Sequence, residues 1–155
     1  MSVHGVPNRM AEGGGAATAR GNRIEAAAVL VIAALVLVLA WIMQPSPAGF
    51  GTHEQLFIIP CPFRWLSGLP CPMCGMTTAF TLMARGDVLS ALSAHVLGPG
   101  VYLATWGLAG AALTGLVRGT PPLPRWVVRA DAARMAMVLI GVGWLVNLAR
   151  HLFGA

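Results

Sequence analysis

Residues Ala26–Met43 read AAAVLVIAALVLVLAWIM and contain no charged side chain. A run of about 18 or more apolar residues is long enough to cross the hydrocarbon core of a bilayer as a helix. Trp41 lies near its end, where interfacial aromatic residues are common. The stretch therefore predicts a membrane-spanning helix over about 24–43. A cleaved signal peptide ending near Ser46 and Ala48 is the competing interpretation, but the apolar run exceeds the usual length of one.

Two further apolar stretches follow. The charge-free stretch Val88–Val117 is too long for one upright span, and Gly-Pro-Gly at 98–100 interrupts it. Because proline removes a backbone donor and disfavours helix at the preceding residue, the sequence predicts interfacial helices over 72–98 and a second span over about 101–117. A third apolar run predicts a span over about 135–153.

The composition agrees with a membrane protein. Hydrophobic residues make up 57% of the 155 residues and charged residues 10%, with a mean hydropathy of +0.74; an ordinary soluble domain is about one-quarter charged. We expect an all-α fold: a small integral membrane protein with about three transmembrane helices and an interfacial helix after a Cys/Pro-rich loop at 44–75. The Gly/Ala-rich residues 1–23 predict a disordered cytoplasmic tail, and residues 24–155 a single membrane domain.

The net charge of +5 comes from scattered arginines with no basic run, which argues against a nucleic-acid partner. Arginine gathers on the cytoplasmic side of membrane proteins. Seven lie in the N-terminal tail and in the loop before the third span: Arg9, Arg20, Arg23, Arg118, Arg125, Arg129 and Arg134. The connection after the first span carries only Arg64 and Arg85. We therefore predict a multi-pass protein of the cell membrane, in contact with the lipid bilayer, with a cytoplasmic N-terminus and an extracytoplasmic cysteine loop.

All three cysteines, Cys61, Cys71 and Cys74, lie within PCPFRWLSGLPCPMCGMTTAF at 60–80. If a helix begins at Pro72, a residue type suited to the first helical position, Cys71 becomes its N-cap. A thiol there would feel the unpaired N–H groups and the positive helix end, which favour thiolate. Cys74 would lie one turn further along.

Three interpretations of the cysteines remain open. A disulfide between Cys71 and Cys74, or between one of them and Cys61, would staple a loop in an oxidising compartment. A redox pair would use Cys71 to attack a partner and Cys74 to resolve the mixed disulfide. A metal site would use all three thiolates, with His53 or His95 as a fourth ligand for zinc, or with nearby methionines for Cu(I). We favour the structural role, because cysteine spacing alone does not establish chemistry.

The residues after the cysteines predict an amphipathic helix. An apolar stripe consists of Met73, Met76, Phe80 and Met83. The opposite face carries Cys74, Thr77, Thr78, Thr81 and Arg85. Gly86 suits the end of this helix and Asp87 the N-cap of the next one.

The segment CPFRWLSGLPCPMCGMTTAF, followed by ARGDVLSAL, resembles the core of the bacterial DUF2752 membrane proteins. The motif C-P-x-C-G-x-T and the later glycine are matched by Cys71, Pro72, Cys74, Gly75, Thr77 and Gly86. Many members carry arginine where this chain has Thr78, and Asn-Pro where it has Gly98-Pro99. The resemblance implies a membrane location and no particular activity, because the family has no established function.

Other enzyme classes find little support, since the sequence lacks G-x-S-x-G, a phosphate-binding glycine loop, H-E-x-x-H and a close carboxylate pair. We expect a non-enzymatic structural or accessory protein with a rigid cysteine loop, which contacts a membrane protein partner or another copy of itself. Pro72, Gly75, Thr77 and Gly86 would shape the loop. The alternatives are a thiol-redox accessory using Cys71 and Cys74, or a metal-binding protein using Cys61 as well; the sequence does not identify a cofactor.

Overall fold

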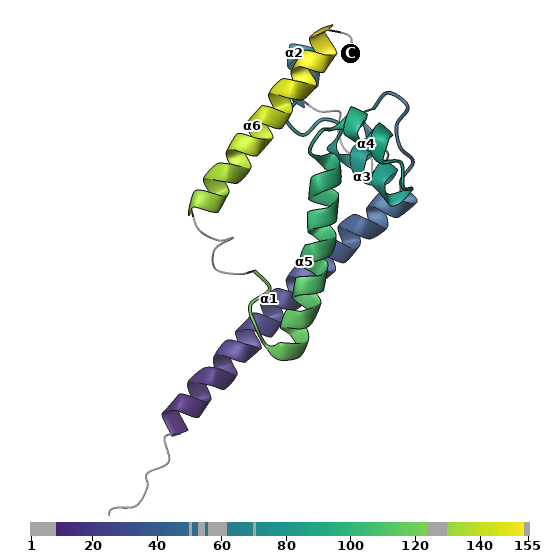
Figure 1. The fold of residues 1–155 in the computed structure, drawn as a ribbon. Helices are drawn as coiled ribbons and strands as arrows, with labels where there is room; N and C mark the ends of the chain where they lie inside the picture. Colours follow the sequence, from purple (N-terminus) through teal and green to yellow (C-terminus); the bar gives the residue numbers. More distant parts are fainter. Residues whose placement is uncertain are drawn as a thin grey trace, which may run out of the picture.

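The computed structural model describes residues 9–49, 51–52, 55, 62–69, 71–123 and 130–153, and within these ranges every regular element is a helix. The helices are α1 (Arg9–Ile42), α2 (Pro62–Ser67), α3 (Met76–Ala84), α4 (Val88–Ala94), α5 (Gly98–Arg118) and α6 (Ala130–Phe153) (Figure 1). The predicted all-α fold is confirmed.

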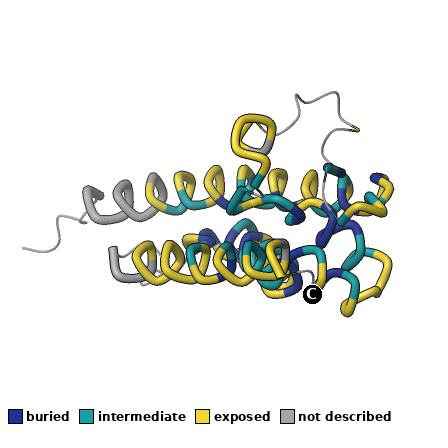
Figure 2. Tube along the Cα trace, turned by 90° about the horizontal axis from the view of Figure 1, so that it is seen from above, coloured by how far each residue is buried: buried dark blue, intermediate teal, exposed yellow. Residues whose placement is uncertain are grey.

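Among the residues that the structure describes, three helices are long and apolar enough to cross a membrane, and they correspond to the three predicted spans. The qualifying stretches are Thr18–Ile42 of α1, Gly98–Arg118 of α5 and Ala133–Arg150 of α6. No more than 17% of any of these windows is buried inside the protein, and exposed residues run along α1 and α6 in Figure 2. Exposed apolar side chains over such lengths need lipid around them. The chain is therefore a multi-pass membrane protein.

Helix α1 begins earlier than the composition predicts. Residues 9–23 are helical where we expected a disordered tail; residues 1–8 lie outside the described part of the chain. Alanine is the best helix former, and extending an existing helix requires no new nucleus. The alanines of this segment therefore continue the spanning helix backwards.

Helix α5 also begins earlier than predicted, at Gly98 rather than near residue 101. Pro99 lies in its first turn, where the missing N–H would have had no helical partner. The proline thus starts the second span instead of separating it from the preceding segment.

Helices α1 and α5 pack along one another in opposite directions (Figure 1). Their contact uses small residues: Ala26, Ala33 and Ala40 recur every seventh residue of α1 and are buried. A Cβ on Gly115 of α5 would lie 3.4 Å from the Cβ of Ala26. Small side chains let two helix backbones approach closely, which is how helices associate in lipid.

The short helices α3 and α4 gather at the end of this pair. The predicted turn between them is confirmed: Gly86 has a φ of 81°, and Asp87 is the N-cap of α4 and accepts a hydrogen bond of 3.0 Å from the backbone N–H of Ser90. Both hydrogen bonds from Ser90, side-chain and backbone, lower the pKa of Asp87 below its ordinary value of 3.8.

Helix α3 rests on the first turns of α5. A Cβ on Gly98 would overlap the Cβ of Ala79, so only glycine permits this approach. One turn further along, the rings of Phe80 and Tyr102 meet edge to face with centroids 5.4 Å apart.

Helix α6 stands apart from the α1–α5 pair in Figure 1. Gly143 faces Leu97, because a Cβ there would lie 2.7 Å from a Leu97 methyl carbon. Arg150 donates a hydrogen bond of 2.9 Å to the carbonyl oxygen of Leu92 in α4. The third span thus meets the rest of the protein near the corner between α4 and α5.

Candidate functional site

Cys71 and Cys74 lie in a tight turn just before α3. Both are half-buried, and they are not joined to one another by a disulfide. The backbone N–H of Cys74 donates a hydrogen bond of 3.0 Å to the carbonyl oxygen of Cys71. We call residues 71–75 the cysteine turn. Cys61 and His53, which the sequence offered as further metal ligands, lie outside the described residues.

The prediction that a helix begins at Pro72 is wrong. Residues 72–75 form turns, and α3 begins at Met76 with Gly75 as its N-cap. Gly75 has a φ of 87°, which an α-helix cannot contain. Cys71 is therefore not the N-cap, and it lies before the turn in which the helix dipole acts most strongly.

Gly75 is where three segments come together. A Cβ at this position would overlap the carbonyl oxygen of Ala94, at the end of α4, and would lie 3.1 Å from the carbonyl oxygen of Gly49. The carbonyl oxygen of Gly75 itself accepts a hydrogen bond of 2.8 Å from the N–H of Ala79. Glycine is thus required twice here, once for its backbone angle and once for the lack of a side chain.

His95 fixes the cysteine turn from the other side. Only 1% of the residue is exposed. Its Nδ1 accepts a hydrogen bond of 3.2 Å from the N–H of Leu97, so Nε2 carries the proton and donates to the carbonyl oxygen of Pro72 at 3.1 Å. Both ring nitrogens of His95 are thus bonded to backbone groups of the protein.

The face of α3 that we predicted to be polar and interfacial is partly buried. Thr78 and Thr81 are buried beside Ala79 and Phe80, whereas Thr77 is exposed. The hydroxyls of Thr78 and Thr52 lie 2.7 Å apart. Buried hydroxyls are tolerated because they find partners of this kind.

The Thr52–Thr78 pair ties the loop after α1 to α3. Thr52 also accepts a hydrogen bond of 3.1 Å from the N–H of Ser46. The Thr81 hydroxyl donates to the carbonyl oxygen of Thr78 in its own helix at 2.8 Å. Sequence reasoning missed the role of Thr52, because a threonine in a polar loop carries no signal for a distant hydroxyl partner.

Arg85 ties the end of α3 to the end of α1. Its Nη2 donates a hydrogen bond of 2.6 Å to the carbonyl oxygen of Met43, and its Nη1 donates one of 2.9 Å to that of Thr81. The Met43 carbonyl lies just beyond the last turn of α1, where backbone acceptors lack helical partners. The arginine supplies a donor there.

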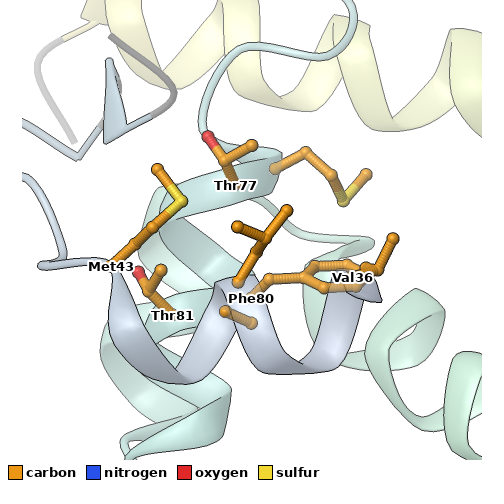
Figure 3. Close-up of a pocket in the computed structure, with 8 residues that line it drawn as sticks. Val36, Met43, Thr77, Phe80 and Thr81 are labelled. Carbon is orange, nitrogen blue, oxygen red and sulfur yellow. The ribbon is translucent and has the colours of Figure 1, made fainter. Parts of the chain in front are cut away.

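An apolar hollow of about 240 Å³ opens between α1 and α3 (Figure 3). The last turns of α1 line one side with Val36, Leu39, Ala40 and Met43. The other side is made by Met76, Thr77, Phe80 and Thr81 of α3. The α3 side of the hollow is thus built from residues that follow the cysteine turn directly.

Within the described part of the chain, no three His, Cys, Asp or Glu side chains gather closely enough to hold a metal ion. Because Cys61 lies outside that part, the proposed metal set of Cys61, Cys71 and Cys74 stays a prediction. The carbonyl oxygen of Pro72 is bonded to His95, and Gly75 lies close against Ala94. In α3, Thr78 is bonded to Thr52, and Arg85 at the end of the helix is bonded to Met43.

A comparison with known families matches residues 61–109 to the family described as "Protein of unknown function (DUF2752)". No curated protein and no solved structure gives a significant match to the chain. The matched residues cover the cysteine turn, α3, α4 and the first half of α5. Over this segment the resemblance to DUF2752 is confirmed.

Proposed function

We propose that this protein is a non-enzymatic accessory protein of the cell membrane, whose cysteine turn is a rigid element for contact with a membrane protein partner. The observation that carries the proposal is the fixing of the turn on two sides, by the His95–Pro72 hydrogen bond and by the close approach of Gly75 to Ala94. A rigid element loses little conformational entropy when it binds, which favours binding to a protein partner.

Exposed apolar side chains in the turn, and in α2, which precedes it in the chain, supply surfaces for such a contact. Met73 within the turn is 55% exposed. In α2, Trp65 and Leu66 are 82% and 84% exposed. Aromatic residues and methionine are enriched at protein interfaces.

The test is photo-crosslinking in cells with a photoreactive amino acid at Met73, compared with the same amino acid at the lipid-exposed Leu103 of α5. We expect a discrete crosslinked protein band from position 73 and not from position 103. The band should survive Cys71→Ser with Cys74→Ser and disappear with Gly75→Ala. A pattern that is the same at both positions would contradict the accessory role.

A thiol-redox role is the second candidate, because the Cys74–Cys71 backbone hydrogen bond holds the two cysteines within one turn. The Cys71 thiolate would attack a partner disulfide and release one partner thiolate. The Cys74 thiolate would then attack the mixed disulfide and release the second, so that the partner gains two electrons and the Cys71–Cys74 pair becomes a disulfide. Cys71 lies before the helix rather than at its N-cap, which is the position on which the redox interpretation relied, and this favours the first proposal.

A trapping experiment distinguishes the structural role of the cysteine turn from the thiol-redox role. If the pair is a redox catalyst, Cys74→Ser should accumulate a mixed disulfide with a partner in cells, visible on non-reducing gels, and Cys71→Ser should not. If the turn is structural, neither variant accumulates one. Replacing both residues by serine provides the background.

For the orientation we propose a cytoplasmic N-terminus and an extracytoplasmic cysteine turn, on the basis of the arginine distribution. Labelling of Cys71 and Cys74 in intact cells with a membrane-impermeant maleimide, with and without prior reduction, tests this. Labelling that occurs only after lysis would place the turn in the cytoplasm.

A further inference from the structure

The hollow between α1 and α3 lies at a defined depth in the membrane. Its α1 side runs from Val36 to Met43, and the candidate span ends at Ile42. At a rise of about 1.5 Å per residue, Val36 lies roughly 9 Å below that end. The hollow thus extends from the boundary of the span into the zone that lipid hydrocarbon occupies.

The walls of the hollow suit a hydrocarbon occupant. The lining side chains are apolar apart from Thr77 and Thr81, and the hydroxyl of Thr81 is already bonded to its own helix. An apolar cavity of roughly 150 Å³ stays dry and accepts a small hydrocarbon. A hollow of about 240 Å³ has room for a segment of an acyl chain.

A cation lies at the upper boundary of the hollow. Arg85 is exposed and donates to the carbonyl oxygens of Met43 and Thr81, both of which line the hollow. These bonds use two of the five N–H donors of a guanidinium. Asp87, the nearest acid in the sequence, caps α4 through Ser90. The guanidinium therefore lies beside the end of the first candidate span, with N–H donors beyond the two used in these bonds.

We propose that the hollow between α1 and α3 holds an acyl chain of an anionic phospholipid whose phosphate group contacts Arg85. The acyl chain fills the space between Val36 and Phe80, and the guanidinium supplies the charge and planar donors that phosphate groups prefer. This inference does not depend on the proposed partner contact of the cysteine turn. It makes Arg85 a lipid-binding residue as well as the link between α1 and α3.

The test uses the full chain in phosphatidylcholine vesicles that contain a trace of a photoreactive lipid, either phosphatidylglycerol or phosphatidylcholine with the same diazirine-bearing acyl chain. After irradiation, adducts are located by mass spectrometry of peptides. We expect adducts on the lining residues of α1 and α3 to favour phosphatidylglycerol by about fivefold. Adducts on the lipid-exposed face of α5, around Leu103, should show no such preference.

Substitutions of Arg85 and of Thr77, each with a control elsewhere in the chain, probe the two parts of the site. Arg85→Gln should bring the preference for phosphatidylglycerol near one, Arg85→Lys should keep most of it, and Arg118→Gln, at the far end of α5, should leave it unchanged. Thr77→Trp places a large ring in the hollow from an exposed position, and should reduce adducts of both lipids there. Leu103→Trp is its control.

Three outcomes would overturn the inference: equal labelling by the two lipids in the wild-type protein, labelling of the hollow no stronger than that of α5, or labelling that Thr77→Trp does not reduce. The wild-type comparison and Thr77→Trp remain decisive if Arg85→Gln fails to fold. A preference that follows Arg118 instead of Arg85 would also count against the site.

Discussion

The imidazole Nε2 of His95 donates a hydrogen bond of 3.1 Å to the carbonyl oxygen of Pro72, across 23 residues of sequence. The bond joins the corner between α4 and α5 to the cysteine turn. His95→Ala removes both this donor and the acceptor of Leu97, and leaves a buried cavity. We expect a loss of about 2–4 kcal/mol of stability, measured by heating in detergent followed by size-exclusion chromatography. Ser93→Ala, at an exposed position nearby, should change little.

Gly75→Ala is expected to be more severe than an ordinary glycine substitution. The new Cβ meets the Ala94 carbonyl oxygen, and the backbone angle is unfavourable for alanine. The left-handed conformation alone costs about 1–2 kcal/mol, so we expect strongly reduced accumulation of folded protein. Gly110→Ala is the matched control, because nothing lies near its Cβ position and alanine favours helix. Equal accumulation of the two variants would contradict the close approach seen at Gly75.

Thr78→Val removes one hydroxyl and keeps the shape of the side chain. Because the hydroxyls of Thr78 and Thr52 are buried and bonded to one another, the single variant leaves one of them without this partner. We expect a loss of about 1–3 kcal/mol. A double-mutant cycle with Thr52→Val should show coupling between the two sites. Additive single losses would mean that the hydroxyls contribute separately.

Asp87 is expected to make the stability of the folded protein depend on pH in the acidic range. Its pKa is lowered in the folded state by hydrogen bonds from Ser90. A group with a depressed folded-state pKa contributes stability above its ordinary value of 3.8, and this contribution disappears as the pH falls through the folded-state pKa. Asp87→Asn keeps an effective N-cap and removes the charge. We expect thermal stability of this variant to fall less between neutral and strongly acidic pH than that of the wild type.

The spans could be predicted from the sequence because hydropathy and length are local properties, and lipid imposes them directly. The turn at Gly86 and Asp87 was predictable for the same reason, since both residue types act on their own backbone. The start of α3 was not: Pro72 favours a helix start, but its carbonyl is bonded to His95 and Gly75 turns the backbone against Ala94. Those contacts depend on α4, which lies about 20 residues later in the chain.

In the candidate site, too, features set by neighbouring residues could be predicted, and features set by distant contacts could not. The cysteines and the motif residues Gly75 and Thr77 stand out by spacing, whereas the role of Thr52 depends on a hydroxyl 26 positions away. Arg85 was placed correctly on α3, but its contact with Met43 requires the end of α1 to lie beside the end of α3. Such contacts depend on how the helices pack, and this packing cannot be predicted from a single sequence.

The separate position of α6 has a consequence for how the protein is assembled. In a bilayer, helices form first and associate afterwards, so a pair with close backbone contact can assemble before a more loosely attached neighbour. The contacts that fix the cysteine turn and line the hollow all lie between Val36 and Gly98. We therefore expect the α1–α5 pair to associate first and the third span to dock onto it afterwards.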